Sequence, residues 1–418
     1  MISISDVVGR ESDVLRERPF QLLLLANLVP PIGTSLLSPV LESLIDPLGA
    51  STANIGLLMS MYTAPAIVMI PIAGVIADRY GRRPVLLFGL ISFGGAGTAI
   101  GLIPDFRAAL FFRFLQGIGF AALTPIIITS VGDLYAGSKE ATAQGLRFTS
   151  SGIVQTITPL AAGGLVVIAW QYPFFIYAIA FPVAAVIYVW FEEPVDPDRE
   201  TDDEGDEDVR NQLGRLWTLV SQRRALAMVV ARGATSVIWI GFLTYNSILV
   251  VELLDSTPAQ AGLLASLASV GYAFSATQAG RIMAYFEDPL VPLLATNVAM
   301  GGGIGIAFVA ETLSIAYVGA TTMGVGFGIM VTLYRSVITD LAPASLRGGL
   351  VSLAEGSGRM AATVTPILMG AAIALATPRI GFVGSVRAVG IAAGAAGGGI
   401  GIVCSLALRY APPIRIEE

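Results

Sequence analysis

Long runs of apolar residues, separated by short polar connections, dominate the chain from about residue 20 onwards. Many runs approach the ~20 residues that a helix needs to cross a bilayer, and they lack the ~10-residue alternation of a membrane β-barrel. The pattern predicts an all-α integral membrane protein with twelve transmembrane helices, six on each side of a polar stretch. Their approximate spans are 20–42, 54–77, 84–103, 106–134, 141–168, 172–191, 225–251, 259–284, 290–310, 312–340, 347–376 and 384–408.

Composition supports a membrane protein and excludes several other classes. Of 418 residues, 55% are hydrophobic and 13% are charged, with a mean hydropathy of +0.76. Soluble domains carry about 25% charged residues, so a soluble globular fold, a disordered chain and a nucleic-acid binder are excluded. The chain has a single cysteine, Cys404, and no histidine. An intramolecular disulfide is therefore impossible, and we expect no metal site and no cofactor.

The distribution of arginine predicts the orientation in the membrane. Basic residues gather at the chain ends and in the even-numbered connections, whereas the odd-numbered ones hold Arg107 and Arg379. By the positive-inside rule, both termini and the central connection are cytoplasmic. The expected organisation is a lead-in (1–19), a first six-helix bundle (20–191), an acidic linker (192–223), a second bundle (224–409) and a tail (410–418).

The acidic residues are concentrated in one stretch, residues 192–208, and the net charge is −6. Only one of the 24 basic residues is a lysine, Lys139. The stretch is either an ordinary solvated linker or a cytoplasmic linker adapted to high salt, as in a halophile. High-GC codon usage would also favour arginine over lysine.

The two halves of the chain repeat each other at a nearly constant offset. NIGLLMSM at 54–61 matches QAGLLASL at 260–267, and QGIGFA at 116–121 matches MGVGFG at 323–328. Asp-Leu at 133–134 and Thr-Pro at 158–159 recur 207 residues later. Two six-helix halves in the same orientation predict a pseudo-two-fold axis along the membrane normal, a cavity where the halves meet, and rocking that opens it to each side in turn.

The segment GVIADRYGRR at 74–83 resembles the loop signature of the major facilitator superfamily, G-x-x-x-D-R-x-G-R-[KR]. The matching residues are Gly74, Asp78, Arg79, Gly81, Arg82 and Arg83. A plain positive-inside anchor is the alternative explanation. Gly74 would admit a neighbouring helix, and Gly81 would supply the turn. We expect these residues to form a conformational latch, in which Asp78 caps the helix start near 345–349 and Arg79 or Arg82 pairs with Asp133.

A second match lies in the fourth helix, where Arg113, Gln116, Gly117 and Gly119 resemble another signature of the same superfamily. The fifth helix carries TPLAAGG at 158–164, which departs from the G-P-x-x-G-G of drug:proton antiporters because Thr158 replaces the first glycine. The resemblance covers essentially the whole chain and is greatest to the twelve-helix drug:proton antiporter branch. It implies a small-molecule carrier, although sugar and organic-anion uptake branches share the loop signature.

Charged residues at mid-membrane depth are candidates for proton coupling because a buried charge is costly. Glu355 and Arg359 are four residues apart on one predicted helix and would share a face, either as a proton switch or as a static salt bridge. Arg113 should face a cavity or a carboxylate, or serve as a structural hydrogen-bonding arginine, and Asp133 with Arg113 is an alternative proton carrier. Arg147, Arg232 and Arg335 complete the set of arginines away from helix ends.

Polar and aromatic residues at mid-helix depth are the predicted substrate-cavity residues, although each could instead be packing. They are Asn27, Tyr62, Gln116, Gln155, Tyr245, Asn246 and Tyr272. The resemblance implies that the first, fourth, seventh and tenth helices line the cavity, which favours Asn27, Arg113, Gln116, Tyr245 and Asn246.

These observations predict a secondary active transporter that moves a small molecule across the cytoplasmic membrane by alternating access. No nucleophile–base pair, metal cluster or P-loop motif points to an enzyme or to ATP-driven transport, and a channel would not need two matched halves. Proton-coupled efflux of drug-like or amphipathic compounds is the first interpretation, and proton-coupled uptake or exchange of an organic anion, sugar or other metabolite is the second. The expected partners are the substrate, protons and the bilayer, with the chain acting as a monomer.

Overall fold

The structure is a computed structural model that describes residues 12–193, 214–286 and 288–412. The chain divides into two compact units. Unit 1 comprises Met1–Ser51 and Leu57–Glu200, and unit 2 comprises Thr52–Gly56 and Thr201–Glu418. Most of the predicted acidic linker, residues 194–213, lies outside the described residues.

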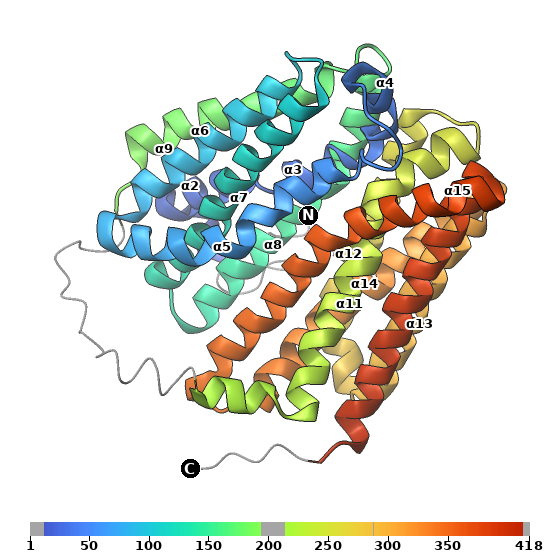
Figure 1. Cartoon of the computed structure of the whole chain (residues 1–418). Coiled ribbons are helices and arrows are strands. Elements are labelled where there is room, and N and C mark those ends of the chain that lie inside the picture. The colour runs from blue at the N-terminus through green and yellow to red at the C-terminus, as the bar shows by residue number, and fades with distance from the viewer. Residues whose placement is uncertain (1–11, 194–213, 287, 413–418) are drawn as a thin grey trace, which may run out of the picture. The chain divides into compact units, whose positions relative to one another are not determined.

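Unit 1, coloured blue to green in Figure 1, is built entirely of helices in its described part. The predicted first helix, 20–42, is broken into short pieces, because Pro30 and Pro31 lack the backbone N–H groups that a continuous helix would use. Its elements are η1 (Ser12–Arg16), α2 (Arg18–Asn27), α3 (Ile32–Ser35), η2 (Ser38–Val40), η3 (Glu42–Leu44), α4 (Ile45–Leu48), α5 (Leu57–Tyr80), α6 (Arg82–Ile100), α7 (Phe106–Leu134), α8 (Gly137–Val166), η4 (Tyr172–Ile179) and α9 (Ala180–Trp190).

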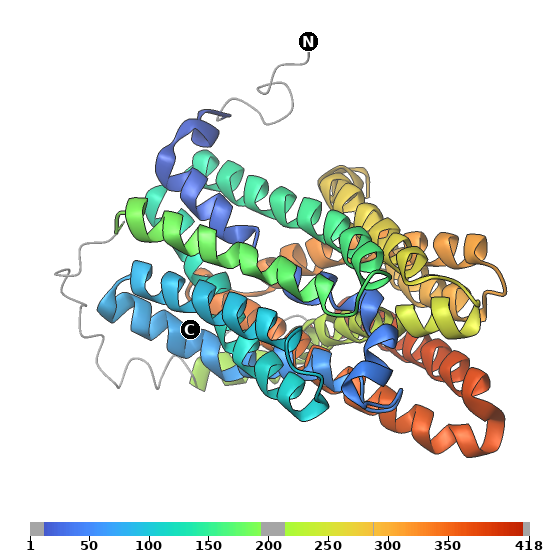
Figure 2. The ribbon, with the colours of Figure 1, turned by 90° about the horizontal axis from the view of Figure 1, so that it is seen from above.

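Unit 2, coloured yellow-green to red, contains α11 (Arg223–Ile248), a π-helical turn η5 (Leu249–Leu253), α12 (Pro258–Tyr285), α13 (Leu290–Val309), α14 (Leu313–Leu341) and α15 (Ala344–Tyr410). The helix α15 covers both of the last two predicted spans. Gly381 interrupts it with φ 72° and ψ 168°, a conformation that only glycine adopts readily. The two arms of α15 therefore meet at a sharp turn (Figures 1 and 2).

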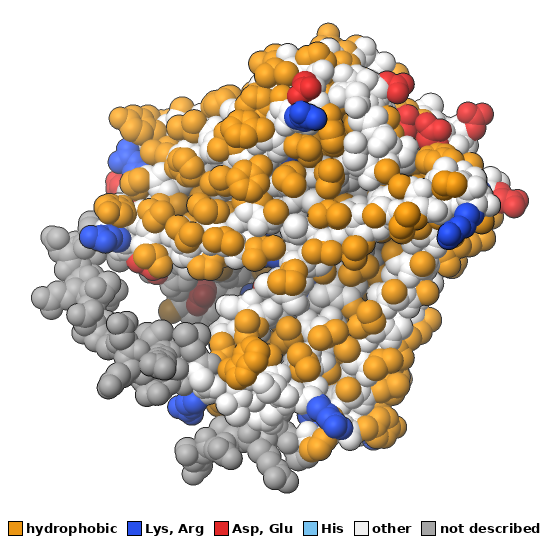
Figure 3. Space-filling view, in the orientation of Figure 1, with side chains coloured by type: hydrophobic (Ala, Val, Ile, Leu, Met, Phe, Trp, Pro, Cys, Tyr) orange, Lys and Arg blue, Asp and Glu red, His pale blue; other side chains and the backbone are white. Residues whose placement is uncertain are grey.

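Nine segments among the described residues are long and apolar enough to cross a membrane. One of them, Leu346–Tyr410, spans both arms of α15, while α8 and α12 are helices of 30 and 28 residues outside this set. This arrangement fits the predicted twelve helices. Hydrophobic side chains cover most of the face shown in Figure 3, and the charged ones lie around its margin, as a bilayer environment requires.

Small residues bring the helices of each unit into close contact, and the pattern is the same in both. A Cβ atom on Gly119 of α7 would lie 2.8 Å from the Gly89 carbonyl oxygen and 2.7 Å from the Phe93 nitrogen, both on α6. A Cβ atom on Gly326 of α14 would lie 3.0 Å from the Thr296 carbonyl oxygen and 3.0 Å from the Met300 nitrogen, both on α13. Each of these three residues lies 207 positions after its equivalent in unit 1.

A second crossing repeats in the same way. A Cβ atom on Gly117 would lie 2.3 Å from the Tyr62 carbonyl oxygen, and one on Gly324 would lie 2.0 Å from the Ala268 carbonyl oxygen. The repeat detected in the sequence therefore extends to individual helix–helix contacts, where only glycine permits the observed approach.

Candidate functional site

Arg113 lies at the centre of unit 1 and is completely buried. Its Nε donates to the Leu58 carbonyl oxygen at 3.0 Å, its Nη1 to Gln116 Oε1 at 2.7 Å, and its Nη2 to the Gly33 carbonyl oxygen at 3.1 Å. The guanidinium also lies over the Tyr62 ring, 4.4 Å from its centroid. These bonds connect α7 to α5 and to the broken first helix.

The hydrogen bonds of Arg113 go to neutral oxygens and its guanidinium lies over an aromatic ring, as expected for a structural hydrogen-bonding arginine. The interruption of the first helix makes this possible, because it leaves the Gly33 carbonyl oxygen available as an acceptor. A role for Arg113 in a cavity between the halves stays a prediction. Asp133 is not in contact with Arg113. The two residues are 20 positions apart on α7, which corresponds to about 30 Å along the helix.

A second polar cluster, the Asn27 cluster, consists of Asn27, Gln144, Arg147, Ser150 and Ser151 and joins α2 to α8. Arg147 Nη1 donates to Asn27 Oδ1 at 3.3 Å, and its Nε donates to Gln144 Oε1 at 2.9 Å. Asn27 Nδ2 lies 3.0 Å from Ser150 Oγ and 2.8 Å from Ser151 Oγ. Asn27 and Arg147 are both buried, so the cluster holds a cation inside a largely apolar unit.

The predicted latch residues gather between α5, α6 and α7. Arg82 Nη2 lies 2.6 Å from Asp133 Oδ2 and 3.8 Å from Asp78 Oδ1, so Arg82 makes the expected pair with Asp133. Arg79 instead lies over the Tyr80 ring. A Cβ atom on Gly74 would meet no atom within 4 Å among the described residues, and the helix approach expected there stays a prediction.

Glu193 is a member of this network that the sequence did not reveal. Its Oε1 accepts from the backbone N–H of Arg82 at 2.7 Å, and its Oε2 accepts from the backbone N–H of Arg83 at 3.1 Å. A carboxylate at the start of α6 satisfies free N–H groups and interacts favourably with the helix dipole. Gly81 makes this contact possible because its φ of 92° is a conformation that glycine adopts readily, and this is the turn predicted for it. The side chain of Arg83 donates to the Tyr188 carbonyl oxygen.

A charge pair lies at the beginning of unit 1, between Glu17 before α2 and Lys139 in the first turn of α8. Lys139 Nζ lies 2.6 Å from Glu17 Oε1. The hydrogen bond from Lys139 lowers the pKa of the Glu17 carboxyl below its ordinary value, despite some desolvation. Both side chains are more than a third exposed, so the pair contributes at most about 1 kcal/mol to stability.

Glu355, on the first arm of α15, pairs with an arginine from a different helix. Arg232 of α11 donates from Nη2 to Glu355 Oε2 at 3.0 Å and from Nε to Glu355 Oε1 at 3.4 Å. Arg232 Nη1 also donates to Ser236 Oγ at 2.8 Å. The sequence analysis placed Arg232 at mid-membrane depth but predicted no partner for it. The spacing of residues along one helix can indicate a contact within that helix, but it cannot indicate a contact with another helix.

The remaining predicted cavity residues lie in different surroundings. Tyr245 is completely buried and Asn246 Nδ2 donates back to the Leu243 carbonyl oxygen at 3.3 Å. Tyr272 packs edge-on against Phe327, which stacks on Trp239 with ring centroids 4.3 Å apart. These three rings bring together α11, α12 and α14 within unit 2.

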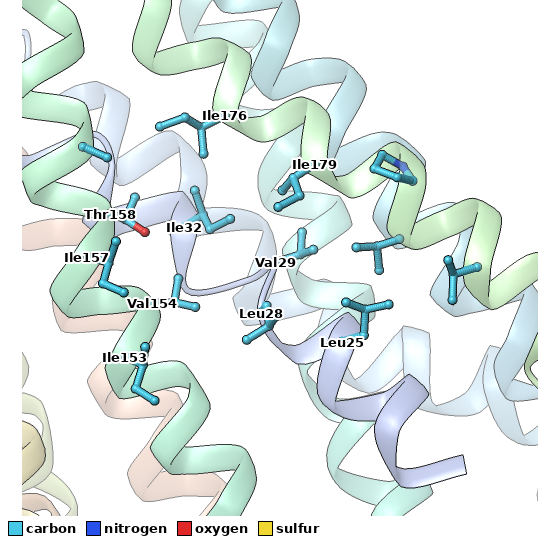
Figure 4. A pocket seen from close by; sticks show the side chains of 14 residues that line it. Leu25, Leu28, Val29, Ile32, Ile153, Val154, Ile157, Thr158, Ile176 and Ile179 are labelled. Atoms are coloured by element: carbon cyan, nitrogen blue, oxygen red, sulfur yellow. The ribbon is translucent and has the colours of Figure 1, made fainter. Parts of the chain in front are cut away.

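Unit 1 contains a cavity of about 490 Å³ between α2–α3, α8 and η4–α9 (Figure 4). Its wall is apolar except for Thr158, and it includes Leu28, Ile32, Val154 and Ile179. None of the seven predicted cavity residues lines it, although Asn27 and Gln155 are next to lining residues in the sequence. A cavity of this size falls within the range of small-molecule sites, about 300–1,000 Å³.

The family model of the Major Facilitator Superfamily matches residues 23–363, which is most of the chain and includes the latch, Arg113 and Glu355. The chain belongs to the Major Facilitator Superfamily. It is therefore a multi-pass membrane protein.

Comparisons with individual proteins agree with this assignment. The bacillibactin exporter of Bacillus subtilis (strain 168) is 34% identical over 35% of this chain, and the match spans only 38% of the exporter. The class B tetracycline resistance protein of Escherichia coli is 26% identical over 81% of this chain and 85% of its own length. A crystal structure of a bacterial homologue of the human lysosomal transporter Spinster has a TM-score of 0.77 and 17% identity, and the superposition covers 94% of this chain and 98% of that one.

Proposed function

We propose that this transporter exports drug-like or amphipathic molecules across the cytoplasmic membrane in exchange for protons, by alternating access. The observation that carries the proposal is the similarity to a tetracycline resistance protein over 81% of the chain. The bacillibactin exporter, although matched over a smaller part, points in the same direction. The repeated glycine crossings support two matched halves that can rock as rigid bodies, since such contacts keep each half closely packed.

In this proposal, the ion pair between Glu355 and Arg232 is the proton-coupling site. Among the candidate carboxylates Glu355 lies deepest in a predicted membrane span, about 12 Å from residue 347, where that span begins. Protonation of Glu355 would break the charge interaction with Arg232, and Arg359 lies one turn further along α15. Movement of either arginine, or its engagement by a substrate, would in turn favour proton uptake by Glu355.

The network of Asp78, Arg82 and Asp133 serves as the latch in the same proposal. The side chain of Asp78 is 65% exposed, and the predicted cap is at the helix start near 345–349. That cap, and the substrate roles of the predicted cavity residues, stay predictions.

The direction of transport can be tested in everted membrane vesicles that carry the full chain. We expect an interior-acid proton gradient to drive accumulation of tetracycline or ethidium, and a protonophore to abolish it. Accumulation that requires the opposite gradient would support uptake instead.

Proton coupling can be tested with Glu355→Gln in proteoliposomes, with Glu311→Gln as a control at an exposed position between α13 and α14. Substrate counterflow should persist in Glu355→Gln because exchange needs no net proton movement, whereas gradient-driven transport should vanish. Gradient-driven transport at the wild-type rate would show that Glu355 is not the coupling site.

A second candidate function is proton-coupled uptake or exchange of an organic anion. It is favoured by the positive charge held inside unit 1, where Arg113 and Arg147 are both buried. Competition of small carboxylates with ethidium in the vesicle assay would distinguish this candidate from drug export.

A further inference from the structure

The cavity in unit 1 has walls of a restricted chemical kind. Thirteen of its fourteen lining residues are apolar and non-aromatic, and the fourteenth is Thr158. Side chains from three parts of the chain converge on it, with Ile153 and Ile157 on α8, Val29 between α2 and α3, and Ile176 on η4 (Figure 4). The wall has no aromatic ring to stack on a planar molecule and no charged side chain to pair with an ion. The wall therefore suits a flexible aliphatic chain better than an aromatic one.

Residues of the Asn27 cluster are close to cavity-lining residues along the chain. Ser151, in the Asn27 cluster, lies one helical turn before Val154, and Asn27 directly precedes Leu28, which lines the cavity. An amphipathic molecule could thus bury a chain among the aliphatic residues while its polar head reaches the hydroxyl and amide groups of that cluster. This separation of apolar wall and polar end is the usual arrangement of a small-molecule site.

We propose that this cavity binds the alkyl chain of an amphipathic substrate, with the polar head directed toward the Asn27 cluster. The inference rests on the export function proposed above and narrows its substrate class to molecules with an unbranched aliphatic chain. Thr158 acquires a role in it, since the residue that departs from the antiporter signature of the fifth helix lies in the cavity wall.

Photolabelling tests the proposal on the full chain in lipid nanodiscs. The probe is an alkyl glucoside with a 12-carbon chain that carries a diazirine, and the labelled residues are identified by mass spectrometry. We expect labelling of α8 around 153–161 and of the segment 25–32. Unlabelled alkyl glucosides should compete, with the affinity rising about fourfold for each added methylene until the cavity is filled.

Two variants that fill the cavity, Ala161→Phe and Val154→Phe, should each reduce the competable labelling at least tenfold. The matched control is Leu160→Phe, because Leu160 is 43% exposed on the same helix and does not line the cavity. Melting temperatures measured for all three variants establish which are folded. The labelling of a folded cavity variant is then compared with that of Leu160→Phe.

The proposal is overturned if exposed apolar residues outside the cavity wall, such as Phe148, are labelled as strongly as Ile153 and Ile157, and if labelling is equal in the cavity variants and Leu160→Phe. That outcome would mean that the probe reports only contact with bilayer lipid. Labelling that alkyl glucosides cannot displace but excess phospholipid can would also overturn it, since the occupant would then be a bilayer lipid. Proton-driven export of ethidium is measured on the same preparation, so a failure of this inference is distinguishable from a failure of the proposed function.

Discussion

At the scale of single residues, Arg113 shows how a cation can be stabilised in a bilayer protein by neutral oxygens. Its hydrogen bonds reach the Leu58 and Gly33 carbonyl oxygens and the side chain of Gln116. Its removal would leave buried backbone acceptors without donors, and each unsatisfied group costs about 1–3 kcal/mol. The guanidinium therefore stabilises the break in the first helix.

We predict that Arg113→Met lowers the stability of the protein by about 2–5 kcal/mol, measured as a loss of melting temperature in detergent. Arg107→Met is the matched control, because Arg107 is exposed near the beginning of the same helix and should change stability by less than about 0.5 kcal/mol. Equal melting temperatures for the two variants would refute a structural role for Arg113.

At the scale of helices, the glycine residues at the repeated crossings set how closely neighbouring helices pack. We predict that Gly119→Ala and Gly326→Ala each destabilise the protein by about 1–3 kcal/mol, because the new methyl group would press on backbone atoms of α6 or α13. Gly132→Ala, on the same helix as Gly119, has no atom closer than 3.5 Å to the added carbon and should be neutral or slightly stabilising. The check is thermal unfolding of the three variants side by side. A neutral Gly119→Ala would contradict the crossing.

The beginning of α6 offers a second prediction at this scale. Glu193→Gln should weaken the two bonds to the Arg82 and Arg83 N–H groups, lower stability by about 0.5–2 kcal/mol and slow transport. Its neighbour Glu192 is exposed and provides the control Glu192→Gln. Thermal unfolding and vesicle transport measure both effects, and identical behaviour of the two variants would exclude a capping role for Glu193.

At the scale of the whole molecule, the arginine distribution predicts that Ser221 is cytoplasmic and Asp105 is external. In a Cys404→Ser background, a membrane-impermeant maleimide applied to intact cells should label Asp105→Cys but not Ser221→Cys. Everted vesicles should show the reverse, and labelling of Ser221→Cys in intact cells would overturn the orientation.

The sequence predicted the helical class and the family because apolar run length and the loop signature are local features of the chain. It did not predict the break at Pro30 and Pro31 as an interruption of the first helix, although those prolines are visible in the sequence. The partners of Glu355 and Arg113 were missed for a different reason. Their bonds join helices whose relative rotation is set by packing, which no spacing along one helix encodes.

The repeated crossings have a consequence for how the two halves can diverge after duplication. The glycine at each crossing meets backbone atoms of its partner helix, such as the carbonyl oxygens of Gly89 and Thr296. Every residue type has that carbonyl oxygen, so this contact alone does not fix the partner residue, which is glycine in one half and threonine in the other. The first half is nevertheless restricted on both sides, because a Cβ atom on Gly89 would lie 2.8 Å from the Leu123 side chain. Tolerance to mutation should therefore differ between the halves. A comprehensive substitution map should show one restricted position at the crossing of Gly326 with Thr296, and two restricted positions at the equivalent crossing 207 residues earlier.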